Sequence, residues 1–326
     1  MGKIRVLWIL PGKEEDAGTM IFSRRQISDL KEKGIAGEIF HFNTCLKIKS
    51  FRNEFLRYKL FVKKNKPNIV HSQYGTITAF LGLMFRNCPY VITFQGSDLN
   101  KTPSDGIFRD FFGRKLSLIA AKKADKIICV SEGLKQQLLD RLQLKTKVIP
   151  FGIDLKHFKP HNIFESRNHL SWKTDEKVIL FNANNPKVKR LDLALEIEKI
   201  VKKTISNFRL FVLEGKTNPE DIPYFINASN VLLLCSDNEG SPTMIKEAMA
   251  CNLPIVANDV GDVAERIKNV ENCYLVNQNV DEMANAIIHV LNSDKQSNGR
   301  EIIQLQNLSN EKIASKVKEL YEEMIN

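Results

Sequence analysis

Residues 231–261 read VLLLCSDNEGSPTMIKEAMACNLPIVANDVG, and this stretch decides the fold class. Val231–Leu234 is an apolar run of strand length, a polar turn follows it, and a segment of helical period leads to a second apolar run, Pro254–Ala257. Ser241 suits an N-cap and Pro242 suits the first helical position, so we expect the helix to begin there and to run to about Cys251. A strand, a helix and a second strand in this order are typical of a parallel sheet covered by helices.

The same alternation of short apolar runs and helical segments continues on both sides of this stretch. It breaks at Pro150–Asp154, and Lys156–Glu176 holds no long apolar run, so we interpret that segment as an interdomain linker. We predict an α/β fold of two facing Rossmann-like domains, residues 1–155 and 156–308, with an interdomain cleft at the carboxyl ends of both sheets. A C-terminal helix over residues 309–326 is expected to pack back on the first domain. The expected strands are Ile4–Leu10, Glu38–Phe42, Ile69–His71, Tyr90–Phe94, Lys126–Val130, Lys147–Ile149, Val178–Phe181, Leu210–Leu213, Val231–Leu234, Pro254–Ala257 and Tyr274–Val276.

Length and composition agree with two globular domains. The chain has 326 residues, more than one hydrophobic core usually holds, and apolar residues make up 43%. Since no stretch approaches the roughly 18 apolar residues of a membrane span, and since Ile4–Leu10 lacks a cleavage site of small residues, we expect a cytoplasmic protein without a signal peptide. The cysteines have no paired spacing of the kind that zinc sites need, which favours reduced structural thiols. They are Cys45, Cys88, Cys129, Cys235, Cys251 and Cys273.

The charge is distributed unevenly. Residues 1–160 contain 29 Lys and Arg against 14 Asp and Glu, a net +15, so the remainder of the +10 chain carries −5. Such asymmetry indicates an anionic partner for the first half: nucleic acid, a phospholipid surface or a phosphorylated acceptor. The segment Lys47–Lys66 mixes aromatic and basic residues, and its stripe of Phe51, Phe55 and Tyr58 favours core packing. Its basic face would still suit an anionic membrane surface at the inner face of the membrane, which we keep as a hypothesis.

Two acids flank the predicted helix start. Glu239 lies in the turn and Glu247 lies inside the helix, about 12 Å away if the rise is helical throughout, so they cannot share a proton or a metal ion. Each should contact a different part of one elongated ligand, and the free amides at the helix start suit a phosphate. A carboxylate suits a vicinal diol such as that of ribose. The alternative is that both acids only favour a helix N-terminus.

The full run resembles the acidic signature of glycosyltransferase family 4, whose members have the GT-B fold. Three segments carry the resemblance: Glu239–Val256, Val148–Asp154 with Phe158–Pro160, and Val130–Gly133. The resemblance implies that Glu239 contacts the donor sugar, that Glu247 holds ribose, and that the backbone of Gly240, Ser241, Pro242 and Thr243 faces sugar and phosphate. It also implies a nucleotide diphosphate sugar as substrate, UDP- or GDP-linked, transfer with retention, and no cofactor or required metal.

A second candidate cluster follows the apolar run Val178–Phe181. Its Lys and Arg residues could neutralise a diphosphate at the carboxyl end of a strand, although a solvated run of charges is the alternative. By the resemblance, Lys189 aligns with the family's diphosphate lysine, whereas Asn184 stands where the family usually has an arginine. Arg190 is a candidate replacement for that arginine. We expect Glu239 and Lys189 to carry catalysis.

On the acceptor side, the candidates are Gly18, Gln95 and Asp98. The family often has a histidine where Gln95 stands, and an amide cannot serve as a general acid or base. Asp98 is either a turn cap or a substrate contact. Gly18 would let backbone approach a phosphate or the acceptor.

The sequence therefore predicts a retaining glycosyltransferase that moves a sugar to a saccharide or lipid-linked hydroxyl acceptor in surface polysaccharide or glycolipid assembly. A sugar-nucleotide epimerase of the same fold is an alternative, but it should need an acid and a base near the sugar, and Gln95 supplies neither. A non-catalytic partner subunit is a second alternative, since both Asn184 and Gln95 depart from the family. We expect no nucleic-acid partner, because no recognition motif accompanies the basic half.

Overall fold

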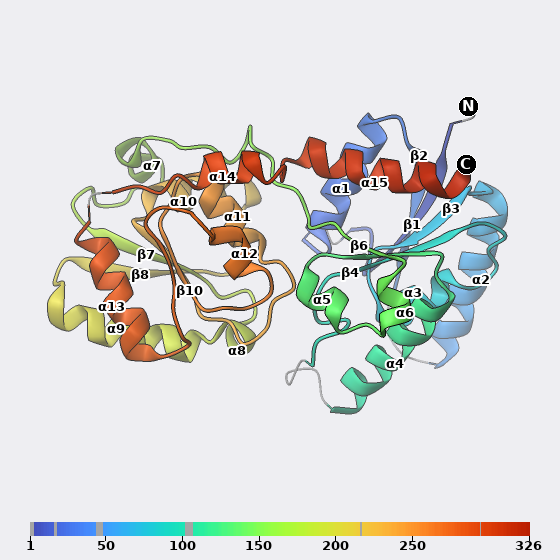
Figure 1. The fold of residues 1–326 in the computed structure, drawn as a ribbon, viewed down its shortest axis with the longest axis horizontal. Coiled ribbons are helices and arrows are strands. Elements are labelled where there is room, and N and C mark those ends of the chain that lie inside the picture. The colour runs from blue at the N-terminus through green and yellow to red at the C-terminus, as the bar shows by residue number, and fades with distance from the viewer. Residues whose placement is uncertain (1–2, 16–17, 44–47, 102–106, 216, 294) are drawn as a thin grey trace. The chain divides into compact units, whose positions relative to one another are not determined.

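The computed structural model describes residues 3–15, 18–43, 48–101, 107–215, 217–293 and 295–326. The chain forms two compact units, the first made of Met1–Gly152 with Asn310–Asn326 and the second of Ile153–Ser309 (Figure 1). Each unit is a parallel sheet flanked by helices. Within the described residues, no helix combines the length and apolarity that crossing a membrane requires.

Unit 1 contains a six-stranded sheet in the order β2-β1-β3-β4-β5-β6, and every pairing in it is parallel. All six strands were predicted, with ends shifted by at most two residues, because strands covered on both faces read as continuous apolar runs. They are β1 (Arg5–Pro11), β2 (Ala36–Phe42), β3 (Ile69–Ser72), β4 (Tyr90–Phe94), β5 (Lys126–Cys129) and β6 (Thr146–Val148).

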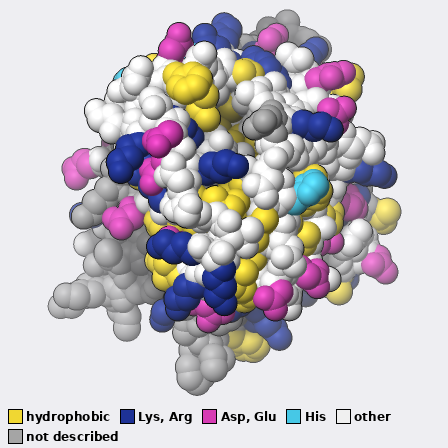
Figure 2. All heavy atoms as spheres, turned by 90° about the vertical axis from the view of Figure 1, so that its left-hand side faces the viewer, with side chains coloured by type: hydrophobic (Ala, Val, Ile, Leu, Met, Phe, Trp, Pro, Cys, Tyr) yellow, Lys and Arg dark blue, Asp and Glu magenta, His cyan; other side chains and the backbone are white. Residues whose placement is uncertain are grey.

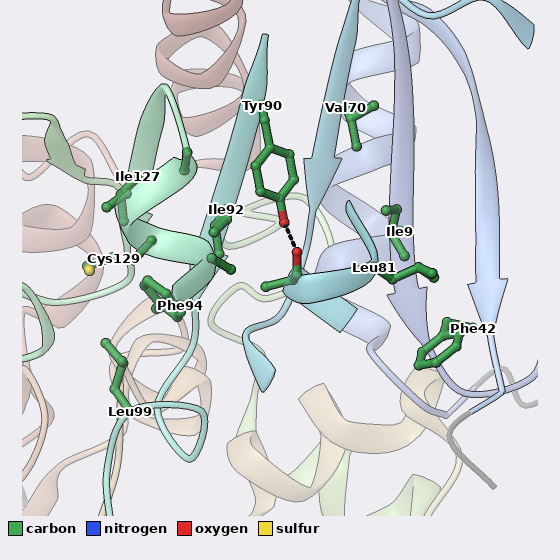
Figure 3. Packing of buried hydrophobic residues seen from close by; sticks show 14 of the residues in the cluster. Ile9, Phe42, Val70, Leu81, Tyr90, Ile92, Phe94, Leu99, Ile127 and Cys129 are labelled. Atoms are coloured by element: carbon green, nitrogen blue, oxygen red, sulfur yellow. Dashed lines mark hydrogen bonds between the residues drawn. The ribbon is translucent and has the colours of Figure 1, made fainter. Parts of the chain in front are cut away.

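The helices of unit 1 cover the sheet, and several of them share a hydrophobic core with it. In that core, the Tyr90 hydroxyl donates to the carbonyl of Ala79 (Figure 3), and its oxygen lies 2.8 Å from Ser72 Oγ. The aromatic stripe of α2 packs against the same core: Tyr58 is fully buried and Phe51 and Phe55 are partly buried, so the core interpretation of that stripe is confirmed. The helices are α1 (Ile21–Glu32), α2 (Ile48–Asn65), α3 (Thr76–Gly82), α4 (Ile107–Lys123), α5 (Glu132–Gln136) and α6 (Asp140–Gln143).

The C-terminal helix α15 (Asn310–Ile325) belongs to unit 1 and packs against α1. Its apolar positions recur at helical spacing, and Ile313, Val317 and Leu320 are buried. Tyr321 is buried as well, and its hydroxyl lies 3.1 Å from Trp8 Nε1 and 2.6 Å from His71 Nδ1. The last helix is therefore joined by hydrogen bonds to the first and third strands of the chain.

Unit 2 contains a five-stranded parallel sheet in the order β11-β10-β9-β7-β8. Its strands were also predicted to within two residues: β7 (Lys177–Asn182), β8 (Phe208–Leu213), β9 (Val231–Leu234), β10 (Ile255–Ala257) and β11 (Cys273–Leu275). Helices α9 (Leu191–Thr204) and α13 (Val280–Leu291) pack against each other and share one core with the sheet. On the face seen in Figure 2, basic and acidic side chains are interspersed. The remaining helices are α7 (Ile163–His169), α8 (Pro186–Lys189), α10 (Ile222–Ala228), α11 (Thr243–Ala250), α12 (Val263–Ile267) and α14 (Gly299–Leu305).

The prediction that Lys156–Glu176 is an interdomain linker was wrong. This segment contains α7, which packs against α10 within unit 2. Arg167 of α7 is only 4% exposed, and its guanidinium donates to the carbonyl of Ala228 and to Asn230 Oδ1. Because the buried contacts of α7 include a charged side chain satisfied by hydrogen bonds, the segment lacks the apolar run by which we recognised other elements.

The cysteines within the described residues have free thiols: Cys88, Cys129, Cys235, Cys251 and Cys273. Cys45 lies outside the described residues.

Candidate functional site

The turn after β9 carries the first of the two predicted acids. Gly240, Ser241 and Pro242 are buried, and Thr243 is half-buried at the start of α11. The helix begins at Thr243 without a side-chain cap, so the predicted Ser241 cap was wrong. Ser241 Oγ instead donates to Asp262 Oδ2 at 2.8 Å. A buried carboxylate needs donors more than the first amides of a helix need an acceptor, which explains why the hydroxyl turns inward.

The two predicted catalytic side chains lie in contact. Lys189 Nζ forms an ion pair with Glu239 Oε1, and the two side chains are only 19% and 13% exposed. Lys189 ends the short helix after β7, while Glu239 follows β9, and these strands are neighbours in the sheet. Adjacent parallel strands deliver their carboxyl ends to the same edge, which is where ligands bind in such sheets. The sequence predicted both residues but not their pairing.

The second acid, Glu247, is only 6% exposed. It lies within α11, whose residues from Met244 to Ala250 are all buried. It stands eight positions after Glu239, and its contact with a different part of the same ligand stays a prediction.

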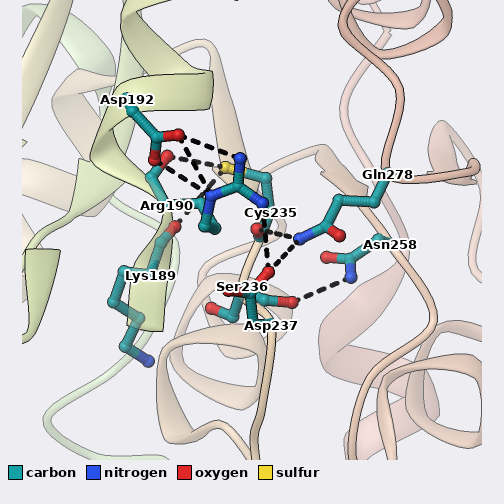
Figure 4. Close-up of polar contacts among 8 residues, drawn as sticks. All are labelled: Lys189, Arg190, Asp192, Cys235, Ser236, Asp237, Asn258 and Gln278. Atoms are coloured by element: carbon teal, nitrogen blue, oxygen red, sulfur yellow. Dashed lines mark hydrogen bonds and ion pairs between the residues drawn. The ribbon is translucent and has the colours of Figure 1, made fainter. Parts of the chain in front are cut away.

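The other basic candidate, Arg190, is held by two carboxylates. Arg190 has a left-handed backbone (φ 60°) between α8 and α9, and its guanidinium lies 3.0 Å from Asp192 Oδ1 and 3.2 Å from Asp237 Oδ1 (Figure 4). Hydrogen bonds to these two acids raise the pKa of Arg190. Gln278 donates to the same Asp237 carboxylate at 2.9 Å. Asp192, Asp237 and Gln278 were missed by sequence reasoning, because they come from three separate connections of the sheet.

Asn184 is exposed, and its backbone amide donates to Asn182 Oδ1 at 3.1 Å. Lys189 pairs with Glu239, whereas Arg190 pairs with Asp192 and with Asp237, which lies in the same turn as Glu239.

One of the acceptor-side candidates, Asp98, lies in a buried turn of unit 1. Asp98 is fully buried, and its carboxylate accepts hydrogen bonds from the backbone amides of Gly75, Gln95 and Gly96 at 2.9 to 3.0 Å. Burial raises the pKa of Asp98. Of the two alternatives for Asp98, the structure shows the turn cap.

The remaining candidates have more open surroundings. The Gln95 amide nitrogen donates to Ser23 Oγ at 2.9 Å and to the carbonyl of Gln73, while its side chain remains half-buried. Gly18 is exposed in the turn before α1. Both lie in unit 1, and Gln95 follows directly after β4, at the carboxyl end of the sheet.

Comparison with known proteins gives consistent matches over both units. Residues 20–157 match the family described as Glycosyltransferase Family 4, and residues 212–304 match the family described as Glycosyl transferases group 1. An uncharacterized glycosyltransferase of Methanocaldococcus jannaschii is 25% identical, over 82% of this chain and 78% of that protein. The UDP-Gal:alpha-D-GlcNAc-diphosphoundecaprenol alpha-1,3-galactosyltransferase of Escherichia coli is 26% identical, over 85% and 81%. The crystal structure of Anabaena HepE in complex with UDP-glucose has the same fold, with a TM-score of 0.73 at 15% identity over 98% of this chain and 100% of that one.

Proposed function

Because the chain belongs to the GT-B glycosyltransferases of the family 4 type, we propose that it binds a UDP- or GDP-linked sugar at the Glu239–Thr243 turn and transfers the sugar with retention. The observation that carries this proposal is the shielded Lys189–Glu239 ion pair at the carboxyl ends of two neighbouring strands. A cation and a carboxylate that lie side by side can bind two parts of one ligand: the cation binds a diphosphate, and the carboxylate binds the hydroxyls of a sugar.

The two side chains would have separate roles once the donor is bound. The diphosphate would attract the ammonium of Lys189, and Glu239 would then accept hydrogen bonds from sugar hydroxyls. Glu247 would hold the ribose diol, and the backbone of residues 240–243 would lie along the sugar and phosphates. Since Lys189 supplies positive charge at the diphosphate, the proposed reaction requires no metal ion.

The chemistry is a front-face substitution. The bond from the anomeric carbon to the diphosphate oxygen breaks, and the acceptor oxygen bonds to the same face of that carbon. The acceptor's proton passes to the departing diphosphate, so no side chain need act as a base. Lys189 stabilises the negative charge that develops on the leaving group, which is where a fixed cation accelerates such a step most. The amide of Gln95, which cannot titrate, is compatible with this route.

The acceptor proposed for this chain is a saccharide or lipid-linked hydroxyl in surface polysaccharide or glycolipid assembly. The Escherichia coli relative supports this, because its name specifies a diphosphoundecaprenol-linked acceptor. The epimerase alternative is set aside by the matched glycosyltransferase families, and activity of the purified chain would exclude a non-catalytic subunit.

Binding and transfer assays test the proposal in two steps. Isothermal titration with UDP, GDP and ADP sugars should show binding of at least one, and transfer should be insensitive to EDTA. Glu239→Gln and Lys189→Met should each lower kcat/KM by about 100-fold, equivalent to about 3 kcal/mol. The matched control is Glu196→Gln, since Glu196 is exposed on α9. Unchanged transfer in both site variants would refute the assigned roles, and wild-type protein that binds none of the sugars would refute the function.

We also propose cytoplasmic, peripheral contact with an anionic membrane surface through the outer face of α2. Leu56 and Leu60, one turn apart, are 51% and 67% exposed, and Lys59 and Lys63 are exposed beside them. The Lys59 ammonium lies 5.6 Å from the ring of Phe85, which is itself 42% exposed. Exposed apolar side chains among lysines suit the boundary between anionic headgroups and acyl chains. Binding to anionic vesicles at low salt decides this proposal.

A further inference from the structure

We propose that Lys246, Asp262 and Arg266 are positioning residues: through Ser241, their buried network holds the Glu239–Pro242 turn in the conformation that binds the donor. The inference rests on the proposed function of that turn. It concerns side chains that do not themselves touch the donor, and it is carried by two independent sets of contacts, one ionic and one between backbones.

The ionic contacts form a continuous chain below the turn. Lys246 Nζ lies 3.1 Å from Ser241 Oγ, which in turn lies 2.8 Å from Asp262 Oδ2. Arg266 Nε donates to the same carboxylate oxygen at 2.8 Å. An ammonium can only donate, so the Ser241 oxygen accepts from Lys246, and the Ser241 hydroxyl donates to Asp262. All three hydrogen bonds therefore run toward the carboxylate of Asp262.

The network is closed to solvent. Lys246 is fully buried, and the side chains of Asp262 and Arg266 are 1% and 6% exposed. Its remaining links lead outward: Arg266 also donates to Gln306 Oε1 at 3.0 Å and pairs with Glu265 at 2.8 Å. Burying an ammonium is costly, and an apolar residue at position 246 would suit the surrounding helix better for stability alone. The contact with Ser241 supplies a functional reason for a lysine there.

The second set of contacts that holds the turn comes from the backbone of Gly261. This glycine has φ +64°, and a Cβ built on it would lie 2.8 Å from the carbonyl oxygen of Gly240 and 3.1 Å from Glu239 Cβ. The chain at residue 261 thus packs directly on the turn, with no room for a side chain. Because Asp262 follows immediately, the ionic and the backbone braces come from the same short connection between β10 and α12.

Charge at Lys246 adds a pH dependence to this arrangement. The charged groups around it are Glu247 on its own helix, and Asp262 and Arg266 from the α12 side. The charged side chain of α14 that reaches α11 is Arg300, which donates to the carbonyl of Ala250. Burial lowers the pKa of Lys246 to about 8. Above that pH Lys246 is mostly neutral, so the hydrogen bond from Lys246 to Ser241 loses its charge. Binding of the sugar donor should therefore weaken.

The test begins with the ligand-free protein. Hydrogen exchange of the amides of Gly240, Ser241 and Thr243 is measured in the wild type, in Lys246→Met and in Gly261→Ala. Both variants should exchange these amides at least 10-fold faster. Gly34→Ala is the matched control, because Gly34 also has a positive φ (+87°) but no atom within 4 Å of the added Cβ. It imposes the same kind of backbone strain without touching the turn.

Binding is measured next, with UDP and GDP as probes. Dissociation constants should rise at least 10-fold in Lys246→Met and Gly261→Ala and stay unchanged in Gly34→Ala. Between pH 7 and pH 9 the wild-type constant should rise, whereas that of Lys246→Met should stay flat. If Lys246→Met fails to fold, Ser241→Ala interrupts the same chain by removing one oxygen.

The outcomes separate this inference from the function on which it rests. Unchanged exchange at the turn in both Lys246→Met and Gly261→Ala overturns the positioning role without reference to any ligand. A pH profile that is the same with and without Lys246 also overturns it. Failure of the wild type to bind either probe counts against the proposed function instead, while the exchange result remains interpretable.

Discussion

Acidification should destabilise unit 1 through a single buried histidine, His71. This residue is fully buried on β3, with Nδ1 2.6 Å from the Tyr321 hydroxyl and Nε2 2.7 Å from Thr93 Oγ1. Trp8 Nε1 can only donate, so it donates to the Tyr321 oxygen at 3.1 Å. The Tyr321 hydroxyl then donates a hydrogen bond to Nδ1 of neutral His71, and Nε2–H of His71 donates to Thr93 Oγ1.

The sign and size of the effect follow from the pKa of His71. Burial lowers it to about 3 in the folded chain, against roughly 6.5 for an unfolded histidine. Between these values the unfolded chain binds more protons, so the stability gained from neutral His71 is complete above pH 6.5 and is lost progressively as pH falls toward 3. The slope approaches about 1.4 kcal/mol per pH unit. From pH 7 to pH 5, the free energy of unfolding should therefore fall by about 2 kcal/mol.

The two tryptophans allow each unit to be followed separately, because Trp8 lies in unit 1 and Trp172 in unit 2. In a Trp172→Phe background, urea unfolding is followed by Trp8 fluorescence at pH 7, 6 and 5. His71→Gln should flatten the pH dependence, whereas His289→Gln, at an exposed position, should leave it as in the parent. The reasoning is refuted if the parent midpoint does not move between pH 7 and pH 5, or if His71→Gln keeps the same slope.

Two further predictions concern α7 and α2. Arg167→Met should lower the stability of unit 2 by about 3 kcal/mol, because the carbonyl of Ala228 and Asn230 Oδ1 lose a charged donor. Trp172 fluorescence in urea measures this; exposed Lys203→Met is the control, and equal midpoints for the two variants would contradict it. The protein should sediment with vesicles of an anionic phospholipid at low salt and be released at high salt. Replacing Leu56 and Leu60 by serine should weaken this binding at least 10-fold, because burying one leucine contributes about 2 kcal/mol. Leu305→Ser, at a 68% exposed position of unit 2, should not weaken it; vesicle binding that is absent, or equal in all variants, would remove the membrane proposal.

The strands could be predicted because each carries its own signal. Parallel strands buried on both faces are apolar throughout, so local sequence suffices to find them. The same holds for α15, whose buried side consists of aliphatic side chains and Tyr321 at helical spacing. It fails for α7, where Arg167 occupies a buried position and finds its partners some sixty residues away, at Ala228 and Asn230. Buried polar contacts of this kind depend on tertiary structure, and no window of sequence contains both partners.

The candidate site divides in the same way. A short motif located the turn of Glu239 and, by family resemblance, Lys189, because both lie in connections that follow strands. The hydrogen-bond partners of the neighbouring residues Arg190 and Ser241 could not be located from the sequence. Arg190 contacts Asp237, and Ser241 contacts Asp262, only once neighbouring strands align their ends. Asp98 was a candidate because it follows a predicted strand, and its carboxylate is engaged by three backbone amides.

Ser241 shows how such competition is decided. A local cap at a helix N-terminus contributes about 1 kcal/mol, and water can replace it at an accessible helix start. Leaving a buried carboxylate without a hydrogen-bond donor lowers the free energy of unfolding by about 1 to 3 kcal/mol or more. The hydroxyl of Ser241 therefore serves Asp262 and leaves α11 without a side-chain cap. The sequence does show a lysine, Lys246, in a helix rich in apolar residues, and a cation that such a helix buries requires a buried polar partner nearby. A charged residue on an otherwise apolar helix is thus a reason to doubt any local capping assignment beside it.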